Sequence, residues 1–115
     1  MEFKMKLHSL TFSMIESGGK SIELRLYDEK RKQIAVGDTI RFSAISNPAK
    51  SILTEVEELF IFGSFEELYR ALPLTECGYT ADNVRSASPK DMLKYYTREK
   101  EEAYGVIGIR IKVLK

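Results

Sequence analysis

Three charged residues near the start of the chain, Lys20, Glu23 and Arg25, are spaced so that they could form one site. Successive residues of a β-strand point to opposite faces, so a strand over 21–27 places Ser21, Glu23 and Arg25 on the same face. A carboxylate can accept from an amine or move a proton, and a guanidinium offers a planar fork to a phosphate. A lysine can place its charge on a phosphate or stabilise an oxyanion. We expect a ligand site formed by Lys20, Ser21, Glu23 and Arg25, in which Lys20 and Glu23 are catalytic if the protein is an enzyme.

The same charges have a plainer interpretation as an ion-pair network on an exposed strand face. Exposed pairs contribute only about 0–1 kcal/mol to stability. The other face of this strand, with Ile22, Leu24 and Leu26, can build a core without them. The functional interpretation therefore requires that the charges lie in a cleft.

Aromatic and basic residues in the second half of the chain form another group of candidate ligand contacts. Tyr79 follows a glycine in a segment without clear periodicity, and Tyr95 lies in a predicted helix. Aromatic faces stack on nucleic-acid bases with a gain of about 1–3 kcal/mol per base. Arg85 and Lys94 could contact phosphates beside them. We expect all four residues to contact a ligand.

Several other kinds of site are disfavoured. The GGKS sequence at 18–21 resembles the end of a P-loop, but that motif needs a glycine where Met14 stands, and it leads into a helix rather than a strand. One histidine and one cysteine, far apart in sequence, cannot form a thiolate–imidazole metal cluster. We expect no metal and no cofactor. A dyad of Cys77 and His8 is a weak candidate. We expect His8 to be a satisfied residue of the barrel wall, with a place near the cleft as the alternative.

The elements that position these residues follow from hydrophobic periodicity. Strands are predicted over residues 3–8, 21–27, 39–45, 51–62 and 105–114, with Asn47-Pro48 as the break before the fourth. Helices are predicted over 12–17, ended by glycines; over 64–72, opened by a capping box of Ser64 and Glu67; and from Ser88-Pro89 to about Ala103. Residues 74–87 are predicted to be a surface loop that could include a helical turn.

This order of elements predicts an α+β fold with helices inserted before the last strand. Mostly antiparallel strands with one apolar face each bury that face and lose their exposed edges by closing into a barrel. An open sheet with helices on one side is equally compatible with the pattern.

Length and composition indicate an ordinary globular protein of one domain over residues 1–115. Its hydrophobic share is 43% and its charged share is 30%, as in typical globular domains. No apolar run approaches the roughly 20 residues of a membrane span, and the first residues lack the apolar region of a signal peptide. A single cysteine fits a reducing compartment, so we expect a cytoplasmic protein without a membrane partner.

The charge balance limits the nucleic-acid partners that fit. The net charge is +1, but residues 1–50 carry +3, residues 51–90 carry −4 and residues 91–115 carry +2. A protein that holds a long duplex by its phosphates usually has a large basic surplus. The sequence therefore argues against a broad RNA-coating surface and allows a modest local basic patch.

The spacing of Gly18, Lys20, Glu23 and Arg25 fits G-x-K-x-x-E-x-R, and in this the chain resembles ASCH domains, a branch of the PUA-like superfamily. The VGDTIRF sequence at 36–42 resembles the second block of that family, and YGVIGIRI at 104–111 resembles its closing strand. The resemblance implies a small β-barrel with helices at its rim and a polar cleft beside the strand. It also implies RNA or a nucleotide-like small molecule as ligand.

Three functions remain open on this basis: a binding module for such a ligand, a small amidohydrolase acting on an acylated nucleoside such as N4-acetylcytidine, and a protein-interaction domain. The similar ASCH amidohydrolases imply a catalytic lysine, which Lys20 matches, and a threonine, where Glu23 stands here instead. They also imply a separate glutamate, for which the candidates are Glu66, Glu67 and Glu76.

Overall fold

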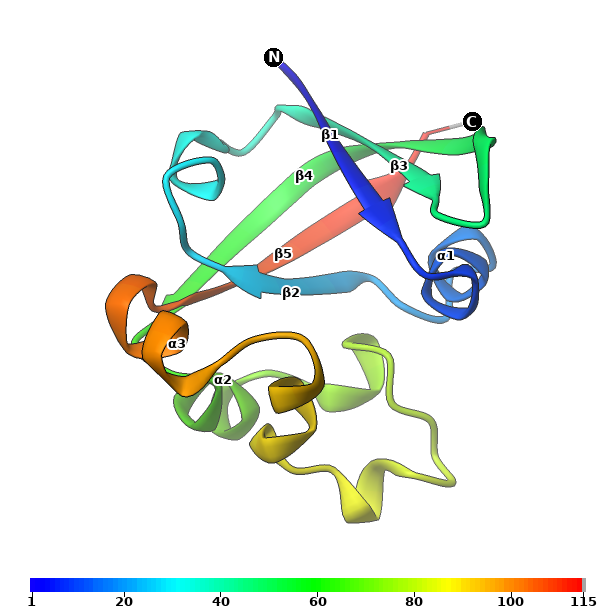
Figure 1. Cartoon of the computed structure of the whole chain (residues 1–115). Helices are drawn as coiled ribbons and strands as arrows, with labels where there is room; N and C mark the ends of the chain where they lie inside the picture. Colours follow the sequence, from blue (N-terminus) through cyan, green and yellow to red (C-terminus); the bar gives the residue numbers. More distant parts are fainter. Residues whose placement is uncertain (115) are drawn as a thin grey trace.

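Five strands form one curled sheet in the computed structural model, which describes residues 1–114. They are β1 (Glu2–Leu7), β2 (Ile22–Leu26), β3 (Thr39–Ala44), β4 (Asn47–Phe62) and β5 (Val106–Val113), in the spatial order β1-β3-β4-β5-β2. The β1–β3 pair is parallel and the other pairs are antiparallel. The sheet curls into a half-barrel that brings the edge strands β1 and β2 toward each other (Figure 1). The expected α+β, barrel-like, mostly antiparallel architecture is confirmed.

The helices fall into two groups. Helix α1 (Ser9–Glu16) connects β1 to β2, and the short 3₁₀ helix η1 (Arg31–Gln33) lies between β2 and β3. All other helices lie between β4 and β5, as expected: α2 (Phe65–Ala71), η2 (Leu74–Glu76), η3 (Val84–Ser86), η4 (Pro89–Lys94) and α3 (Arg98–Tyr104). Figure 1 shows this inserted segment along one side of the half-barrel, below β2. No helix within residues 1–114 is long and apolar enough to cross a membrane.

Strand β4 is the element that makes the sheet curl. Its first part pairs with β3 and its second part pairs with β5, and the register shifts between Val56 and Glu58. A β-bulge of this kind bends a strand and increases its twist. One long strand therefore belongs to both halves of the curled sheet.

Two hydrophobic cores hold the fold together. The first fills the half-barrel and includes Phe12, Phe42, Ile107 and Ile109. The second lies between the outer face of β2 and β5 and the inserted segment, and it contains Ile22, Leu24, Leu26, Phe65, Leu68, Cys77, Met92 and Val106. Strand β2 is therefore covered on both faces.

The residues of β2 alternate between two faces as predicted, but the polar face is not exposed to solvent. Ile22 and Leu24 do share one buried face. Glu23 lies opposite Ile109 and Arg25 opposite Ile107 in the β2–β5 register, and facing residues of an antiparallel pair share a face. The polar face thus points toward the inside of the half-barrel rather than into open solvent.

The ends of two helices follow the sequence signals. After α1 the chain turns at Gly18, whose φ of 84° lies in the left-handed region that favours glycine. Ser64 caps the start of α2, and its side chain accepts a hydrogen bond from the Glu67 N–H at 3.2 Å. Both boundaries agree with the predictions.

The single helix predicted from Ser88 to about Ala103 is wrong. The chain forms η4, leaves helical structure around Tyr96, and begins α3 after Thr97, whose hydroxyl accepts from the Lys100 N–H at 3.2 Å. Because η4 is a 3₁₀ helix with about three residues per turn, its side chains do not follow α-helical spacing: Met92 is buried, whereas Leu93 is 43% exposed.

The turn before β4 also differs from the prediction. The chain reverses at Ile45 and Ser46, and Asn47-Pro48 already belongs to β4 rather than breaking a strand. Pro48 is tolerated there because it lies at the beginning of the strand.

Candidate functional site

Strand β2 and the turn before it build an ionic network of three side chains. Lys20 Nζ lies 2.9 Å from Oε1 of Glu23, and Arg25 Nη2 lies 2.9 Å from Oε2 of the same carboxylate. The side chains of Lys20, Glu23 and Arg25 are only 11%, 5% and 15% exposed. The network is therefore mostly withdrawn from solvent, unlike the exposed ion pairs of the plainer interpretation.

The carboxylate of Glu23 uses its acceptor positions within the protein. Oε1 also accepts from the Leu24 N–H at 3.2 Å, and Oε2 accepts from both Nε and Nη2 of Arg25, at 3.1 and 2.9 Å. A carboxylate offers about four such positions. Glu23 therefore has no free position for a ligand, and its structural effect is to hold Lys20 and Arg25 in place.

The surroundings keep Glu23 ionised. Burial by itself would raise the pKa of this carboxyl, but the charges of Lys20 and Arg25 and their hydrogen bonds outweigh it and hold the pKa below its usual value. A carboxylate with a lowered pKa is a poor proton acceptor near neutral pH. This geometry does not support the expectation that Glu23 transfers a proton.

Arg25 also joins the two edges of the sheet. Its Nη2 donates to the main-chain oxygen of Lys6 in β1 at 2.9 Å, although β1 and β2 are not neighbours in the hydrogen-bonded strand order. We call this junction the β1–β2 seam. One guanidinium thus links the seam to the ionic network.

A cleft of about 490 Å³ opens beside the network. Strand β2 and the turn before it contribute Lys20, Glu23 and Arg25 to its lining, and the inserted segment contributes Tyr79, Lys94 and Tyr95. Six of the eight residues expected at a ligand site are thus brought together.

The other two expected residues do not line this cleft. The Ser21 hydroxyl donates to Glu76 Oε1 at 3.0 Å, and its N–H donates to the Glu76 main-chain oxygen at 2.9 Å. Ser21 therefore ties η2 to β2. Arg85 lies exposed on η3, outside the residues that line the cleft.

A chain of hydrogen bonds fixes one wall of the cleft. The Tyr79 hydroxyl donates to Asp91 Oδ2 at 2.6 Å and lies 2.8 Å from the Tyr69 hydroxyl. Burial together with the hydrogen bond to Asp91 raises the pKa of Tyr79, whereas the same hydrogen bond lowers the pKa of Asp91. Tyr79 therefore remains a neutral phenol whose proton is held by Asp91. Asp91 is a site residue that the sequence pattern did not identify.

Gly78 lets the inserted segment approach Lys20 closely. Its φ is 110°, and a Cβ built there would lie 3.4 Å from Lys20 Cδ. This position favours glycine because side chains rarely adopt such a φ. The methylene chain of Lys20 is thus packed between β2 and the loop that carries Tyr79.

His8 and two apolar side chains form the outer lip of the cleft. His8 is exposed and lines the cleft, with its ring centroid 6.3 Å from that of Tyr95, so it matches the alternative place near the cleft rather than the favoured place in the barrel wall. Leu10 and Ile45 line the same cleft and are 74% and 50% exposed. Only the fold reveals this lip, because its residues come from distant segments.

Nucleophilic and metal chemistry find little support among the described residues. Cys77 is buried, and burial raises the pKa of its thiol to about 11. It is thus a thiol at neutral pH, and a thiol is a poor nucleophile. Within residues 1–114 no group of three His, Cys, Asp or Glu side chains is placed to hold a metal ion.

The three candidates for a separate catalytic glutamate are engaged elsewhere. Glu66 pairs with Arg70, and Glu67 accepts from the Gly63 N–H. Glu76 accepts from Arg110 as well as from Ser21. None of the three lines the cleft, whose acidic lining residues are Glu23 and Asp91.

Comparison with known proteins identifies the family. A family model of the ASCH domain matches residues 5–115. The chain belongs to the ASCH domain family. Among curated proteins no match to this ASCH chain is found.

Solved structures agree with this assignment. Protein PF0455 from Pyrococcus furiosus is 32% identical to this ASCH chain, with a TM-score of 0.76, covering 100% of this chain and 99% of that one. The hypothetical protein PH0355 is 31% identical, with a TM-score of 0.82 and coverage of 99% and 100%. An ASCH protein from Zymomonas mobilis is 16% identical, with a TM-score of 0.56 over 96% of this chain and 66% of that one, and it supports the fold alone.

Proposed function

We propose that the cleft of this ASCH domain binds RNA or a nucleotide-like small molecule. The observation that carries the proposal is the sheltered Lys20–Glu23–Arg25 network at the cleft. With Glu23 saturated, the N–H groups of Lys20 and Arg25 that face neither Glu23 nor the Lys6 main-chain oxygen are the groups available to an anionic or carbonyl-bearing ligand. Such a ligand gains from charge-assisted hydrogen bonds in partial shelter from water.

The rim supplies surfaces for a planar ring. Tyr95 is 57% exposed and lies beside the His8 ring, with Leu10 and Ile45 on the same lip. Exposed aromatic faces stack on bases, and the apolar neighbours can exclude water from one edge. Lys94, also in the lining, can pair with a phosphate.

The size of the cleft fits this ligand class. Small-molecule sites measure about 300–1,000 Å³, and this cleft measures about 490 Å³. A nucleoside, a nucleotide or one unstacked base of a strand is of suitable size. A duplex held along its length is disfavoured by the net charge of +1.

A thermal-shift screen of nucleosides, nucleotides and short RNAs tests the proposal, because a ligand that binds only the folded state raises its stability. The hits are repeated with Tyr95→Ala and with the control Tyr104→Ala, which removes an exposed tyrosine outside the cleft lining. We expect Tyr95→Ala to reduce the shift and Tyr104→Ala to keep it. No hit in any class would contradict the proposal.

The amidohydrolase remains the second candidate because Lys20 lies at the cleft. Its weakness is the lack of a free carboxylate: Glu23 is saturated, and Asp91 is engaged by Tyr79 and the Ser88 N–H. Incubation with N4-acetylcytidine tests it directly, and an absence of cytidine above background would eliminate it.

A ribonuclease-insensitive pull-down of one protein would favour the interaction-domain alternative. The cytoplasmic location remains a prediction.

A further inference from the structure

Three exposed lysines line the β1–β2 seam that leads away from the cleft. Lys4 and Lys6 lie on the outer face of β1, and Lys30 reaches that strand from the β2–β3 connection, donating from Nζ to the Lys4 main-chain oxygen at 2.9 Å. Within residues 1–114 no carboxylate lies within ion-pair distance of these three side chains. We call Lys4, Lys6 and Lys30 the seam lysines.

The acids in the neighbouring segments are already paired with other cations. Glu2 pairs with Arg41 at 3.3 Å, and Asp28 pairs with Arg31 at 2.9 Å. The more exposed Glu29 lies 3.6 Å from Lys32 Nζ. The positive charge of the seam lysines therefore remains uncompensated locally, although the whole chain carries only +1.

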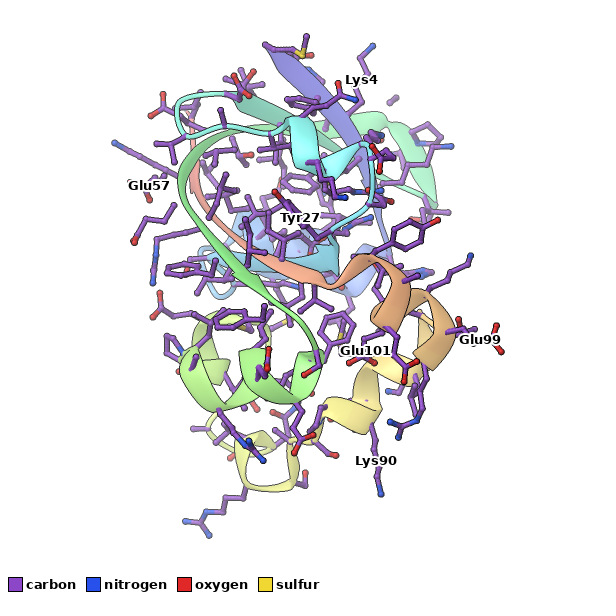
Figure 2. All side chains as sticks on the ribbon, turned by 90° about the vertical axis from the view of Figure 1, so that its left-hand side faces the viewer. Lys4, Tyr27, Glu57, Lys90, Glu99 and Glu101 are labelled. Carbon is purple, nitrogen blue, oxygen red and sulfur yellow. The ribbon has the colours of Figure 1, made fainter. Side chains whose placement is uncertain are left out.

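The seam lysines continue directly from the cleft. Lys6 lines the cleft, and its main-chain oxygen accepts from Arg25. Lys4 lies two residues before Lys6 on the same face of the strand, so the Cα atoms of the two residues are about 7 Å apart. This separation is below the screening length of about 8 Å at physiological salt, so the charges act together on an anion. Figure 2 shows Lys4 at the strand end of the molecule, opposite Lys90 at the helical end.

We infer that the seam lysines carry the phosphate backbone of a single-stranded polynucleotide, one base of which occupies the cleft. This inference rests on the proposed function and selects an extended strand over a free mononucleotide. Single-strand sites combine a basic path along the backbone with aromatic surfaces for bases. Here the seam supplies the path, and Tyr95 and His8 at its end supply the surfaces.

The inference predicts that affinity depends on ligand length. Fluorescence anisotropy or calorimetry is performed with uridine monophosphate and with uridine oligonucleotides of three and nine nucleotides, in RNA and in deoxyribose form. We expect the nonanucleotide to bind at least tenfold more tightly than the mononucleotide. Equal affinities at all lengths would overturn the inference while leaving the proposed function intact, whereas no binding by any probe would contradict the proposed function itself.

A charge-matched pair of variants tests the seam directly. Lys4→Ala/Lys30→Ala removes two exposed seam lysines without touching the cleft lining, and Lys100→Ala/Lys112→Ala removes two exposed lysines elsewhere. The seam variant should weaken nonanucleotide binding about tenfold and lower the salt slope by about 1.4, at about 0.7 per phosphate contact. The control should change neither, and mononucleotide binding should be the same in both variants. Equal losses in both variants would show only general charge attraction and overturn the inference.

Competition distinguishes a nucleic acid from other polyanions. Inorganic polyphosphate has the charge of a backbone but no bases to stack. We expect it to displace the nonanucleotide only at concentrations at least tenfold above those of an unlabelled nonanucleotide. Displacement at equal phosphate concentration would contradict a role for bases and overturn the assignment to a polynucleotide.

Discussion

Arg25 donates from both Nε and Nη2 to the same carboxylate oxygen of Glu23, at 3.1 and 2.9 Å. The other oxygen of Glu23 lies 2.9 Å from Lys20 Nζ. One buried anion thus orients two cations that border the cleft. This makes Glu23 a positioning residue whose removal affects the fold before it affects any ligand contact.

Glu23→Gln is expected to destabilise the protein by about 3–5 kcal/mol, because loss of one partner leaves buried charge without compensation. Urea denaturation measures the change. The control is Glu57→Gln at the exposed bulge of β4, visible at the edge of Figure 2, which should stay within about 0.5 kcal/mol of wild type. Equal stabilities of the two variants would contradict a contribution of the ionic network to folding stability.

Acid should weaken the fold through the same carboxylate. The folded-state pKa of Glu23 lies below its ordinary value of 4.5, so the unfolded chain binds the proton more readily. Its stabilisation is therefore present above about pH 4.5 and is lost as pH falls through the lower folded pKa. When the urea midpoint is measured from pH 7 to pH 3, the midpoint of the wild-type protein should decrease as the pH falls below about 4.5. The midpoint of Glu23→Gln should decrease less steeply. Parallel curves would contradict the assignment.

Gly105, at the junction of α3 and β5, should not tolerate a side chain. Its φ of 72° and ψ of −170° form a conformation reserved almost entirely for glycine, and a Cβ would lie 2.9 Å from the Phe62 main-chain oxygen. Gly105→Ala should cost about 3 kcal/mol or more. Gly18→Ala has a similar φ of 84° but open space around its Cβ, and it should cost about 1–2 kcal/mol. A smaller cost at Gly105 would contradict this backbone geometry.

The hydroxyl of Tyr79 should contribute to the wall of the cleft. Tyr79→Phe removes the donor to Asp91 and the partner of Tyr69, for an expected loss of about 1–2 kcal/mol. Tyr104→Phe, at an exposed position, should change stability by less than about 0.5 kcal/mol. The pKa of Asp91, followed by NMR, should rise in Tyr79→Phe because it loses its main hydrogen bond. An unchanged Asp91 pKa would show that this hydrogen bond is not formed in solution.

Local signals in the sequence predict most of the fold. Ser64, Glu67 and Gly18 act through neighbouring backbone, so their effects can be inferred without knowing distant contacts. The interruption around Tyr96 was missed because Thr97 competes with an otherwise helical pattern as a second N-cap. The β4 bulge at Glu57 has no comparable local signal.

The candidate site was harder to predict than the fold. The residue types and spacing of Lys20, Glu23 and Arg25 are the same for a surface network and for a buried one, and only the orientation of their strand face toward the inside of the half-barrel distinguishes them. The second role of Asp91 and the exposure of His8 depend on contacts between distant segments. Such contacts leave no periodic pattern in a single sequence.

The most direct measurement is the NMR chemical-shift map of the protein titrated with a uridine trinucleotide. We expect the largest amide shifts on Lys20, Arg25 and Tyr79 and on the segment around Tyr95, with small shifts on the outer face of β4 near Glu57. Binding that shifts the β4 face and leaves Lys20, Arg25 and Tyr95 unchanged would contradict the proposal that the cleft is the ligand site.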